Sequence, residues 1–272
     1  MRQVWHENLI DQLIPITRAA GDAVMAVYAM TEMRTWEKQD SSPVTEADLA
    51  SHRVLATHLA PLLPDCPVVS EEDAVSHAHG RCKARFWLID PLDGTREFIA
   101  RNGEFTVNIA LVENGRSVLG IVFAPAMDAL YWGGAGLGSF RCIRGRTSAL
   151  GVSAGNAGDC RVVASRSHLD QATQSFIAHL GEVSLIQAGS SLKFCRVAEG
   201  AADIYPRLAP TCEWDTAAAQ AVLEGAGGTV VDLNGQPLRY GKQDRFNPPF
   251  IATRDVTLIP ERSIHSNPAP RD

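Results

Sequence analysis

Apolar and polar positions follow a helical period in two stretches near the start of the chain. An amphipathic helix is predicted over residues 9–30, because apolar residues recur three and four positions apart, at Leu9, Leu13, Ala20, Val24 and Val27. Pro15 either kinks this helix or marks its true first turn. Residues 34–44 are polar and predict an exposed loop. A second helix is predicted over residues 45–64, with Thr45 as its N-cap.

The period then changes to that of strands. Short strands are predicted at 67–70 and 85–90, and each is followed directly by, or ends on, an acid. Two β-rich runs within residues 105–125 flank Asn114-Gly115, the pair preferred in a two-residue hairpin turn. Residues 129–134 predict a further strand, and the glycines at 133–138 predict a loop. The first 150 residues are therefore predicted to form two helices followed by a mostly antiparallel sheet.

The second half alternates strand and helix patterns. Strands are predicted at 161–166, 183–189 and 202–206, and helices at 169–181, 190–200 and 214–228. Such a βαβα pattern predicts an α/β layer. The fold class is therefore mixed α/β, with an α+β subdomain at 1–150, an α/β subdomain at 151–260 and a tail at 261–272 that we expect to be disordered.

Composition and charge narrow the function. The 272 residues carry a net charge of −6 and contain no run of Lys and Arg, so we expect no nucleic-acid partner. No stretch is long and apolar enough for a membrane span, and the N-terminus lacks the apolar block of a signal peptide. The six cysteines form no CxxC pair, which favours reduced thiols and a cytoplasmic location.

Two aspartates at the end of an apolar strand carry the first chemical signal, in the sequence IDPLDGT. Asp90 and Asp93 would repel each other unless a cation lies between them. Pro91 stiffens the turn, so that the carbonyl of Leu92 can point to the same cation. Such hard oxygen ligands suit Mg²⁺. The next two residues, Gly94 and Thr95, offer a close backbone N–H and a hydroxyl to an anion.

Three more acids occupy comparable places. Glu71 follows a strand, and Asp48 and Asp215 lie in the first turns of predicted helices. An acid in a first turn most often serves the helix dipole, and acids in a turn are commonly solvated. Their repeated position at the ends of apolar elements nevertheless favours a shared metal site.

The motifs SPVTEAD, SEED, DPLDGT and WDTAAA together resemble the inositol monophosphatase superfamily of Mg²⁺-dependent, lithium-sensitive phosphatases. The longer blocks EFIARNGEFTVNIAL and GSSLKFC are similar to those of the bacterial CysQ-type 3′(2′),5′-bisphosphate nucleotidases. The resemblance extends from about residue 9 to 250. It implies a layered αβαβα sandwich, with most metal ligands in the first subdomain and nucleotide-binding elements in the second.

The resemblance also implies roles for the acids. Glu71, Asp90 and the Leu92 carbonyl would hold a first Mg²⁺, while Asp90, Asp93 and Asp215 would hold a second. Glu71 would help to hold a weaker third ion through water. Thr95, hydrogen-bonded to Asp48, would orient the attacking water and relay its proton, and no covalent intermediate is needed.

The implied substrate is adenosine 3′,5′-bisphosphate, which gives AMP in sulfur assimilation or nucleotide recycling, together with its sulfated relative. The 5′-phosphate needs cations, for which Lys193 and Arg207 are the candidates. Lys38, in the polar loop, is a candidate to close over the site. The complete set of predicted substrate contacts is Glu71, Leu92, Asp93, Gly94, Thr95, Ser165, His168, Gly189, Ser190, Lys193, Arg207 and Asp215.

Two alternatives stay open. The same acids would serve hydrolysis of inositol monophosphate or fructose 1,6-bisphosphate, because they handle only the phosphate that is removed. A nucleotide-binding protein without activity is the second alternative, although all five acids and Thr95 are present. The sequence leaves open whether the chain forms a homodimer, whether it associates with the cytoplasmic membrane face, and which of the two nucleotides it prefers.

Overall fold

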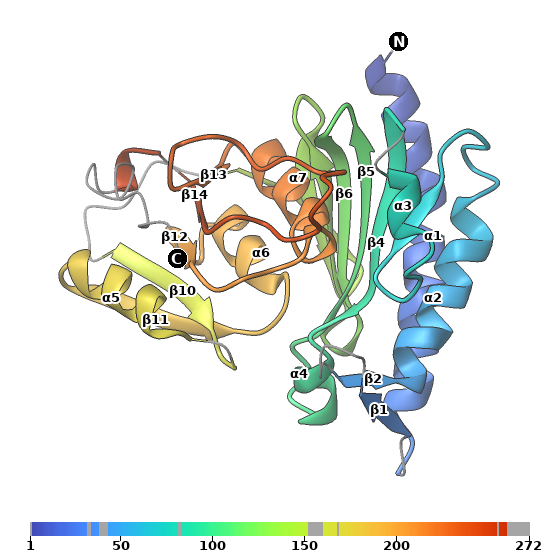
Figure 1. Ribbon diagram of the computed structural model, residues 1–272, viewed down its shortest axis with the longest axis horizontal. Coiled ribbons are helices and arrows are strands. Elements are labelled where there is room, and N and C mark those ends of the chain that lie inside the picture. Colours follow the sequence, from blue (N-terminus) through green and yellow to red (C-terminus); the bar gives the residue numbers. More distant parts are fainter. Residues whose placement is uncertain are drawn as a thin grey trace.

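The computed structural model describes residues 2–31, 34–37, 43–80, 83–151, 160–167, 169–254 and 256–259. Its layers alternate helices and sheets (Figure 1): α1 and α2, a seven-stranded sheet, α6 and α7, a five-stranded sheet, and α5. The predicted αβαβα sandwich is confirmed. The helices are α1 (Arg2–Tyr28), α2 (Glu46–Leu59), α3 (His77–Gly80), α4 (Thr95–Ile99), α5 (Gln171–His179), α6 (Leu192–Ala198) and α7 (Ala217–Gly225).

The seven-stranded sheet has the order β3-β4-β5-β6-β7-β8-β9 and is antiparallel except where β3 pairs with β4. The hairpin between β5 and β6 turns at Asn114 and Gly115, with φ of 51° and 75°, as predicted. Such positive φ values suit Asn and Gly. The strands are β3 (Val68–Ser70), β4 (Arg85–Asp93), β5 (Thr106–Glu113), β6 (Arg116–Ala124), β7 (Ala129–Gly134), β8 (Gly138–Ile143) and β9 (Arg146–Leu150).

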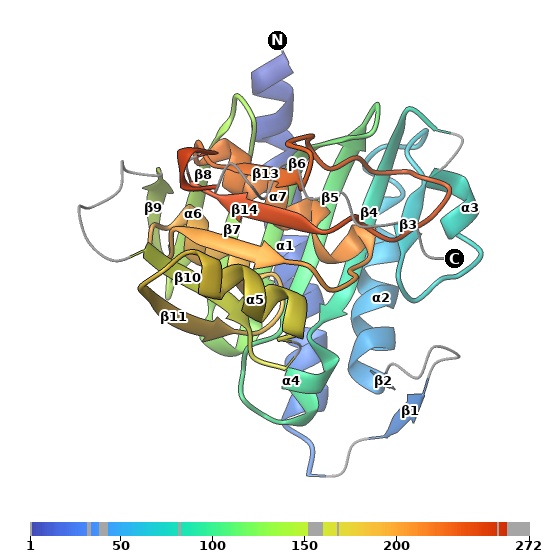
Figure 2. The same ribbon diagram turned by 60° about the vertical axis from the view of Figure 1, so that its left-hand side comes forward.

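The five-stranded sheet has the order β11-β10-β12-β14-β13 (Figure 2). Its first three strands are parallel, as the βαβα pattern predicts, but β14 runs antiparallel to both of its neighbours. The strands β13 and β14 and the hairpin β8–β9 were not predicted. The strands are β10 (Cys160–Ser165), β11 (Val183–Ala188), β12 (Ile204–Arg207), β13 (Thr229–Asp232) and β14 (Phe250–Thr253).

Three buried clusters fill the spaces between the layers. One lies between α1, α2 and the first sheet and contains Trp87 and Leu111. A second joins the other face of that sheet to α6, α7 and the second sheet, through residues such as Phe194 and Val222. The third lies between the second sheet and α5. Apolar burial on both faces of each sheet therefore holds the layers together.

Several boundaries differ from the sequence prediction. The first helix begins at Arg2, so Pro15 lies inside it and does not mark its first turn. Packing of α1 on the sheet outweighs the missing N–H of proline. The second helix ends at Leu59, before Pro61, whose nitrogen carries no hydrogen to continue the helical hydrogen bonds. Strand β4 continues past Asp90 to Asp93, across a register shift that tolerates Pro91.

Two predicted loops also contain strands. In the polar stretch 34–44, β1 (Thr35–Glu37) pairs antiparallel with β2 (Pro43–Thr45). In the glycine-rich stretch 133–138, the glycines belong largely to the ends of β7 and β8. Three short 3₁₀ turns complete the structure, η1 (Pro125–Met127), η2 (Glu213–Asp215) and η3 (Val256–Leu258). No helix in the described part of the chain is both long and apolar enough to cross a bilayer.

Candidate active site

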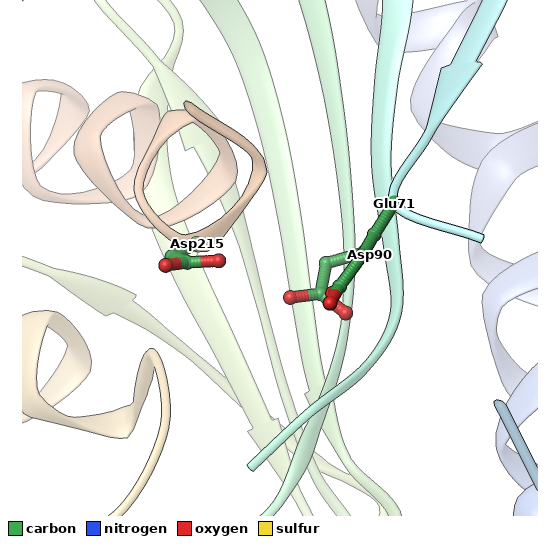
Figure 3. Close-up of side chains that lie close together, drawn as sticks. All are labelled: Glu71, Asp90 and Asp215. Atoms are coloured by element: carbon green, nitrogen blue, oxygen red, sulfur yellow. The ribbon is translucent and has the colours of Figure 1, made fainter. Parts of the chain in front are cut away.

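Three acids from distant parts of the sequence meet at one edge of the first sheet (Figure 3). Glu71 follows β3, Asp90 lies on the neighbouring strand β4, and Asp215 approaches from the opposite side at the end of η2. One carboxylate oxygen from each lies within 4.8 Å of the other two. Because β3 and β4 run parallel, their carboxyl ends lie side by side and bring the first two acids together.

The sequence predicted Asp215 in the first turn of a helix, but in the structure it lies before α7. It ends the short turn η2, and its Oδ2 accepts the N–H of Cys212 at 2.8 Å. Burial raises its pKa well above the usual range, and the negative charges of Asp93 and Glu71 raise it further. Carboxylates held this close favour a positive charge between them, so the oxygen donor set fits a divalent cation.

Asp93 lies on the same pocket wall but outside this tight group of three. Its Oδ2 accepts hydrogen bonds from the backbone N–H of Ser191 at 2.6 Å and from the Ser191 hydroxyl at 2.8 Å. Weaker contacts come from Asn108 at 3.4 Å and Thr106 at 3.5 Å. Burial raises the pKa of Asp93, while Lys193 and the two hydrogen bonds from Ser191 oppose the change. With one oxygen so engaged, the other remains for a cation.

Ser191 also links Asp93 to the backbone of Asp215. Its hydroxyl lies 2.9 Å from the Asp215 carbonyl oxygen, and Asn108 donates to the same hydroxyl at 2.8 Å. Neither Ser191 nor Asn108 was selected from the sequence. Asn108 is opposite Asp90 in the pairing of β4 with β5, so the strand register would have been needed to find it.

Thr95 and Asp48 are joined as expected. The Thr95 hydroxyl lies 3.2 Å from Oδ1 of Asp48 and 3.4 Å from the Leu92 carbonyl oxygen. Oδ2 of Asp48 accepts the N–H and the hydroxyl of Thr45, at 2.7 and 2.6 Å. Asp48 therefore completes the capping box of α2 with one oxygen and holds Thr95 with the other.

A cavity of about 300 Å³ extends from the acids toward the second sheet. Lys193 on α6 forms part of its wall, although only 6% of this residue is exposed. Its Nζ donates to the Ser190 carbonyl at 2.6 Å and lies 5.4 Å from the centre of the Tyr205 ring. Burial lowers the pKa of Lys193 to about 8, against the opposing effect of Asp93.

Most of the other predicted contacts share this wall. They are Leu92, Gly94, Thr95, Ser165, Ser190 and Arg207. Gly189 lies outside it, and its N–H donates to Glu104 at 2.9 Å. The N–H groups of Gly189 and Ser191 thus donate to carboxylates of the protein itself, so the N–H of Gly189 does not make the predicted contact with a substrate. Lys38 and His168 lie outside the described residues.

Glu97 is a further wall residue that sequence reasoning missed. It lies on α4, only two positions after Thr95, and 5% of it is exposed. Phe194 and Tyr205 also line the cavity. The spacing from Gly94 to Glu97 is one helical turn, so recognition of the short helix α4 would have placed Glu97 beside the site.

The sequence model of the inositol monophosphatase family matches residues 5–263. The 3′(2′),5′-bisphosphate nucleotidase CysQ of Escherichia coli strain K12 is 47% identical over 244 residues, which cover 89% of this chain and 98% of that protein. The enzyme of the same name from Aggregatibacter actinomycetemcomitans is 35% identical over 266 residues, covering 96% and 98%.

Solved structures of similar proteins indicate the same family. CysQ from Bacteroides thetaiotaomicron, described as a bacterial member of the inositol monophosphatase family, is 39% identical, with a TM-score of 0.80 over 92% of this chain and 98% of that one. An IMPase from Thermotoga maritima is 26% identical, with a TM-score of 0.77 over 94% and 95%. With a matching family model over nearly its whole length, this chain belongs to the inositol monophosphatase family.

Proposed function

We propose that this protein is a metal-dependent phosphatase that removes the 3′-phosphate of adenosine 3′,5′-bisphosphate and releases AMP. The observation that carries the proposal is one cavity lined by two chemically different groups of residues. The acids Glu71, Asp90 and Asp215 form one group, and the buried Lys193 with Arg207 forms the other. The bisphosphate nucleotidase names of the relatives support the same substrate.

The acids suit Mg²⁺, and two or three ions fit the charge of the assembly. Glu71, Asp90 and the Leu92 carbonyl would hold the first, while Asp90, Asp93 and Asp215 would hold the second. When bound, such ions supply positive charge to the transferred phosphoryl group and acidify water. Four carboxylates together with a phosphate monoester carry about six negative charges, which three divalent cations neutralise.

The chain itself orients the water and the phosphate. Since the Thr95 hydroxyl donates to Asp48, its oxygen is free to accept a proton from the attacking water. The Gly94 turn, with φ of 89°, lets the backbone approach a phosphate oxygen without a side chain in the way. The water oxygen then bonds to phosphorus as the bond from phosphorus to the ribose oxygen breaks. Thr95 takes the proton of the water and passes its own to Asp48, and the ribose oxygen takes up a proton from solvent.

The two cations of the cavity wall distinguish a bisphosphate from a monophosphate. Lys193 and Arg207 supply positive charge from the protein itself, and inositol 1-phosphate has no second phosphate to meet it. A sulfated 5′-phosphate would meet the same cations, which makes the sulfated nucleotide a second substrate.

We further propose a cytoplasmic location, which the five free cysteines among the described residues support.

The test is release of phosphate with Mg²⁺ from adenosine 3′,5′-bisphosphate and from inositol 1-phosphate, by the parent and by Asp90→Asn. We expect the parent to prefer the nucleotide and to give AMP. Asp90→Asn should lower kcat/KM on the order of a hundred- to a thousandfold, because it removes a charged metal ligand.

The matched control is Asp128→Asn, which changes an exposed aspartate that pairs with Arg18 away from the cavity. It should leave the rate unchanged. Equal activity of Asp90→Asn and the parent would refute the metal site. A preference for inositol 1-phosphate would refute the nucleotide assignment while leaving the phosphatase chemistry in place.

A further inference from the structure

The cavity wall contains one carboxylate more than the metal and water chemistry uses. Among the described wall residues the acids are Glu71, Asp90, Asp93, Asp215 and Glu97. The first four are the candidate metal ligands. Glu97 is 5% exposed, and a buried carboxylate needs a donor or a positive charge to offset its lost hydration. The question is therefore which donor or positive charge the Glu97 carboxylate binds in this site.

The side chain of Glu97 folds back over the turn at Gly94. Its Oε2 lies 3.4 Å from the position that a Cβ on Gly94 would occupy, and its Cγ lies 2.7 Å from the corresponding position on Gly189. A side chain at position 189 would overlap the Glu104 carbonyl oxygen, at 2.6 Å, as well as the side chain of Glu97. Glu97 is thus held directly beside the backbone turn where we expect the phosphate that is removed.

The two oxygens of Glu97 have different surroundings. Oε1 accepts the hydroxyl of Ser167 at 2.7 Å. Within the described residues, no protein donor is recorded for Oε2, and Lys193 donates to the Ser190 carbonyl rather than forming an ion pair with Glu97. Oε2 is therefore an acceptor that a bound ligand can use.

The chemistry of a carboxylate restricts what that ligand group is. A phosphate oxygen would be repelled, whereas a hydroxyl donates to a carboxylate in a short, charge-assisted hydrogen bond. In a nucleoside 3′-phosphate the hydroxyl nearest to the phosphate is the 2′-hydroxyl, on the adjacent ribose carbon. A carboxylate beside the phosphate position is well placed to accept from it.

We propose that Glu97 accepts a hydrogen bond from the ribose hydroxyl adjacent to the phosphate that is removed, and that it thereby selects ribonucleotides over 2′-deoxyribonucleotides. The inference rests on the proposed function, because it specifies which nucleotide the same cavity takes. A site that binds a hydroxyl in this way discriminates against the analogue that lacks it, since the buried acceptor is then left unpaired.

Two neighbouring residues provide matched controls. Glu104 lies on the loop after α4, accepts the Gly189 N–H at 2.9 Å and pairs with Arg166 at 2.9 and 3.0 Å, but lies outside the cavity wall. Ser167 holds Glu97 Oε1 from an exposed position. If Glu97 acts only by holding these segments together, Glu104→Gln and Ser167→Ala should reproduce the effect of its loss.

The experiment compares kcat/KM for adenosine 3′,5′-bisphosphate and its 2′-deoxy analogue in the parent, Glu97→Gln, Glu104→Gln and Ser167→Ala. We expect the parent to prefer the ribonucleotide by about ten- to a hundredfold, the value of one charge-assisted hydrogen bond. Glu97→Gln should lose most of this preference through slower use of the ribonucleotide alone. Both controls should keep the parental ratio.

Other results would overturn the inference. These are equal use of both nucleotides by the parent, an unchanged ratio in Glu97→Gln, or an equal loss for both substrates. Hydrolysis of neither nucleotide by the parent would overturn the proposed function and this inference with it. Should Glu97→Gln fail to fold by circular dichroism, calorimetry of the parent with AMP and 2′-deoxy-AMP decides, because equal affinity for both would contradict the proposal.

Discussion

At the scale of single residues, the buried ammonium of Lys193 determines how the proposed enzyme responds to pH. Loss of hydration lowers the pKa of Lys193 to about 8, although Asp93 and other acids nearby partly oppose this effect. Only the protonated form can attract a phosphate. The phosphate itself is fully ionised above about pH 7, so it does not change charge in the same range.

We therefore expect KM for adenosine 3′,5′-bisphosphate to rise as the pH passes upward through about 8, while kcat follows the ionisation of water. Steady-state kinetics between pH 7 and 9 separates the two. In Lys193→Met, which keeps the bulk but removes the charge, KM should already be high at pH 7 and stay constant. A parental KM that does not change over this range would refute the role of Lys193 in binding.

The residue scale also shows what the sequence can reveal. Glu71, Asp90 and Asp215 could be selected because each lies at one end of an apolar element and carries a carboxylate that can bind a metal ion. Ser191 could not, because its contribution depends on a contact with Asp93 across 98 positions of the chain. A serine before a helix most often caps that helix, whereas Ser191 makes no side-chain cap and binds two parts of the site instead.

At the scale of elements, the start of α2 connects stability to chemistry. The Thr45 hydroxyl accepts the N–H of Ala47 at 3.1 Å. One carboxylate oxygen of Asp48 accepts the N–H of Thr45, and the other accepts the hydroxyl of Thr95. The cap that fixes the beginning of a helix therefore also fixes the group that orients Thr95.

Replacing Thr45 by Val keeps the branched shape but removes the hydroxyl. We expect the free energy of unfolding to fall by about 1 kcal/mol, as for other lost caps, and kcat to fall as well because Asp48 is less well held. Urea denaturation and phosphate release measure the two effects. Thr45→Ser keeps the hydroxyl and should preserve both; a Val variant with normal kcat would separate the cap from catalysis.

Elements differ in how far local sequence defines them. The β5–β6 hairpin was predicted because Asn114-Gly115 specifies the turn by itself. The sequence left open whether Pro15 lies inside the first helix or in its first turn, because packing on the sheet, which overrides its helix-breaking tendency, decides between the two. The antiparallel insertion of β14 between β12 and β13 depends on partners elsewhere in the chain, and no local pattern encodes it.

At the scale of the whole molecule, α7 lies between the two sheets and begins two residues after Asp215. It packs on β5, β6 and β7, where Gly120 leaves room for its backbone. A Cβ on Gly120 would overlap the carbonyl group of Ala218. The position of Asp215 relative to Asp90 therefore depends on a glycine in the centre of the first sheet.

Gly120→Ala should force α7 away from the sheet. We expect the free energy of unfolding to fall by about 1–3 kcal/mol, as for an overpacked core, and Mg²⁺ to bind more weakly because Asp215 moves with the helix. Denaturation and calorimetry with Mg²⁺ measure these effects. Gly151→Ala, at a position with open space around it, should change neither. If the Gly120→Ala variant were as stable as the parent, the close approach of Gly120 to the Ala218 carbonyl would be contradicted.

The separation of Asp90 and Asp215 in sequence has a consequence for biosynthesis. A ribosome that adds roughly 5–20 residues each second needs roughly 6–25 s to pass from one aspartate to the other. During that interval the nascent chain has the two acids of the first sheet but neither Asp215 nor the helix that holds it in place. Phosphatase activity is therefore withheld until synthesis has passed Asp215 and α7, and chains that stop before this point contribute none.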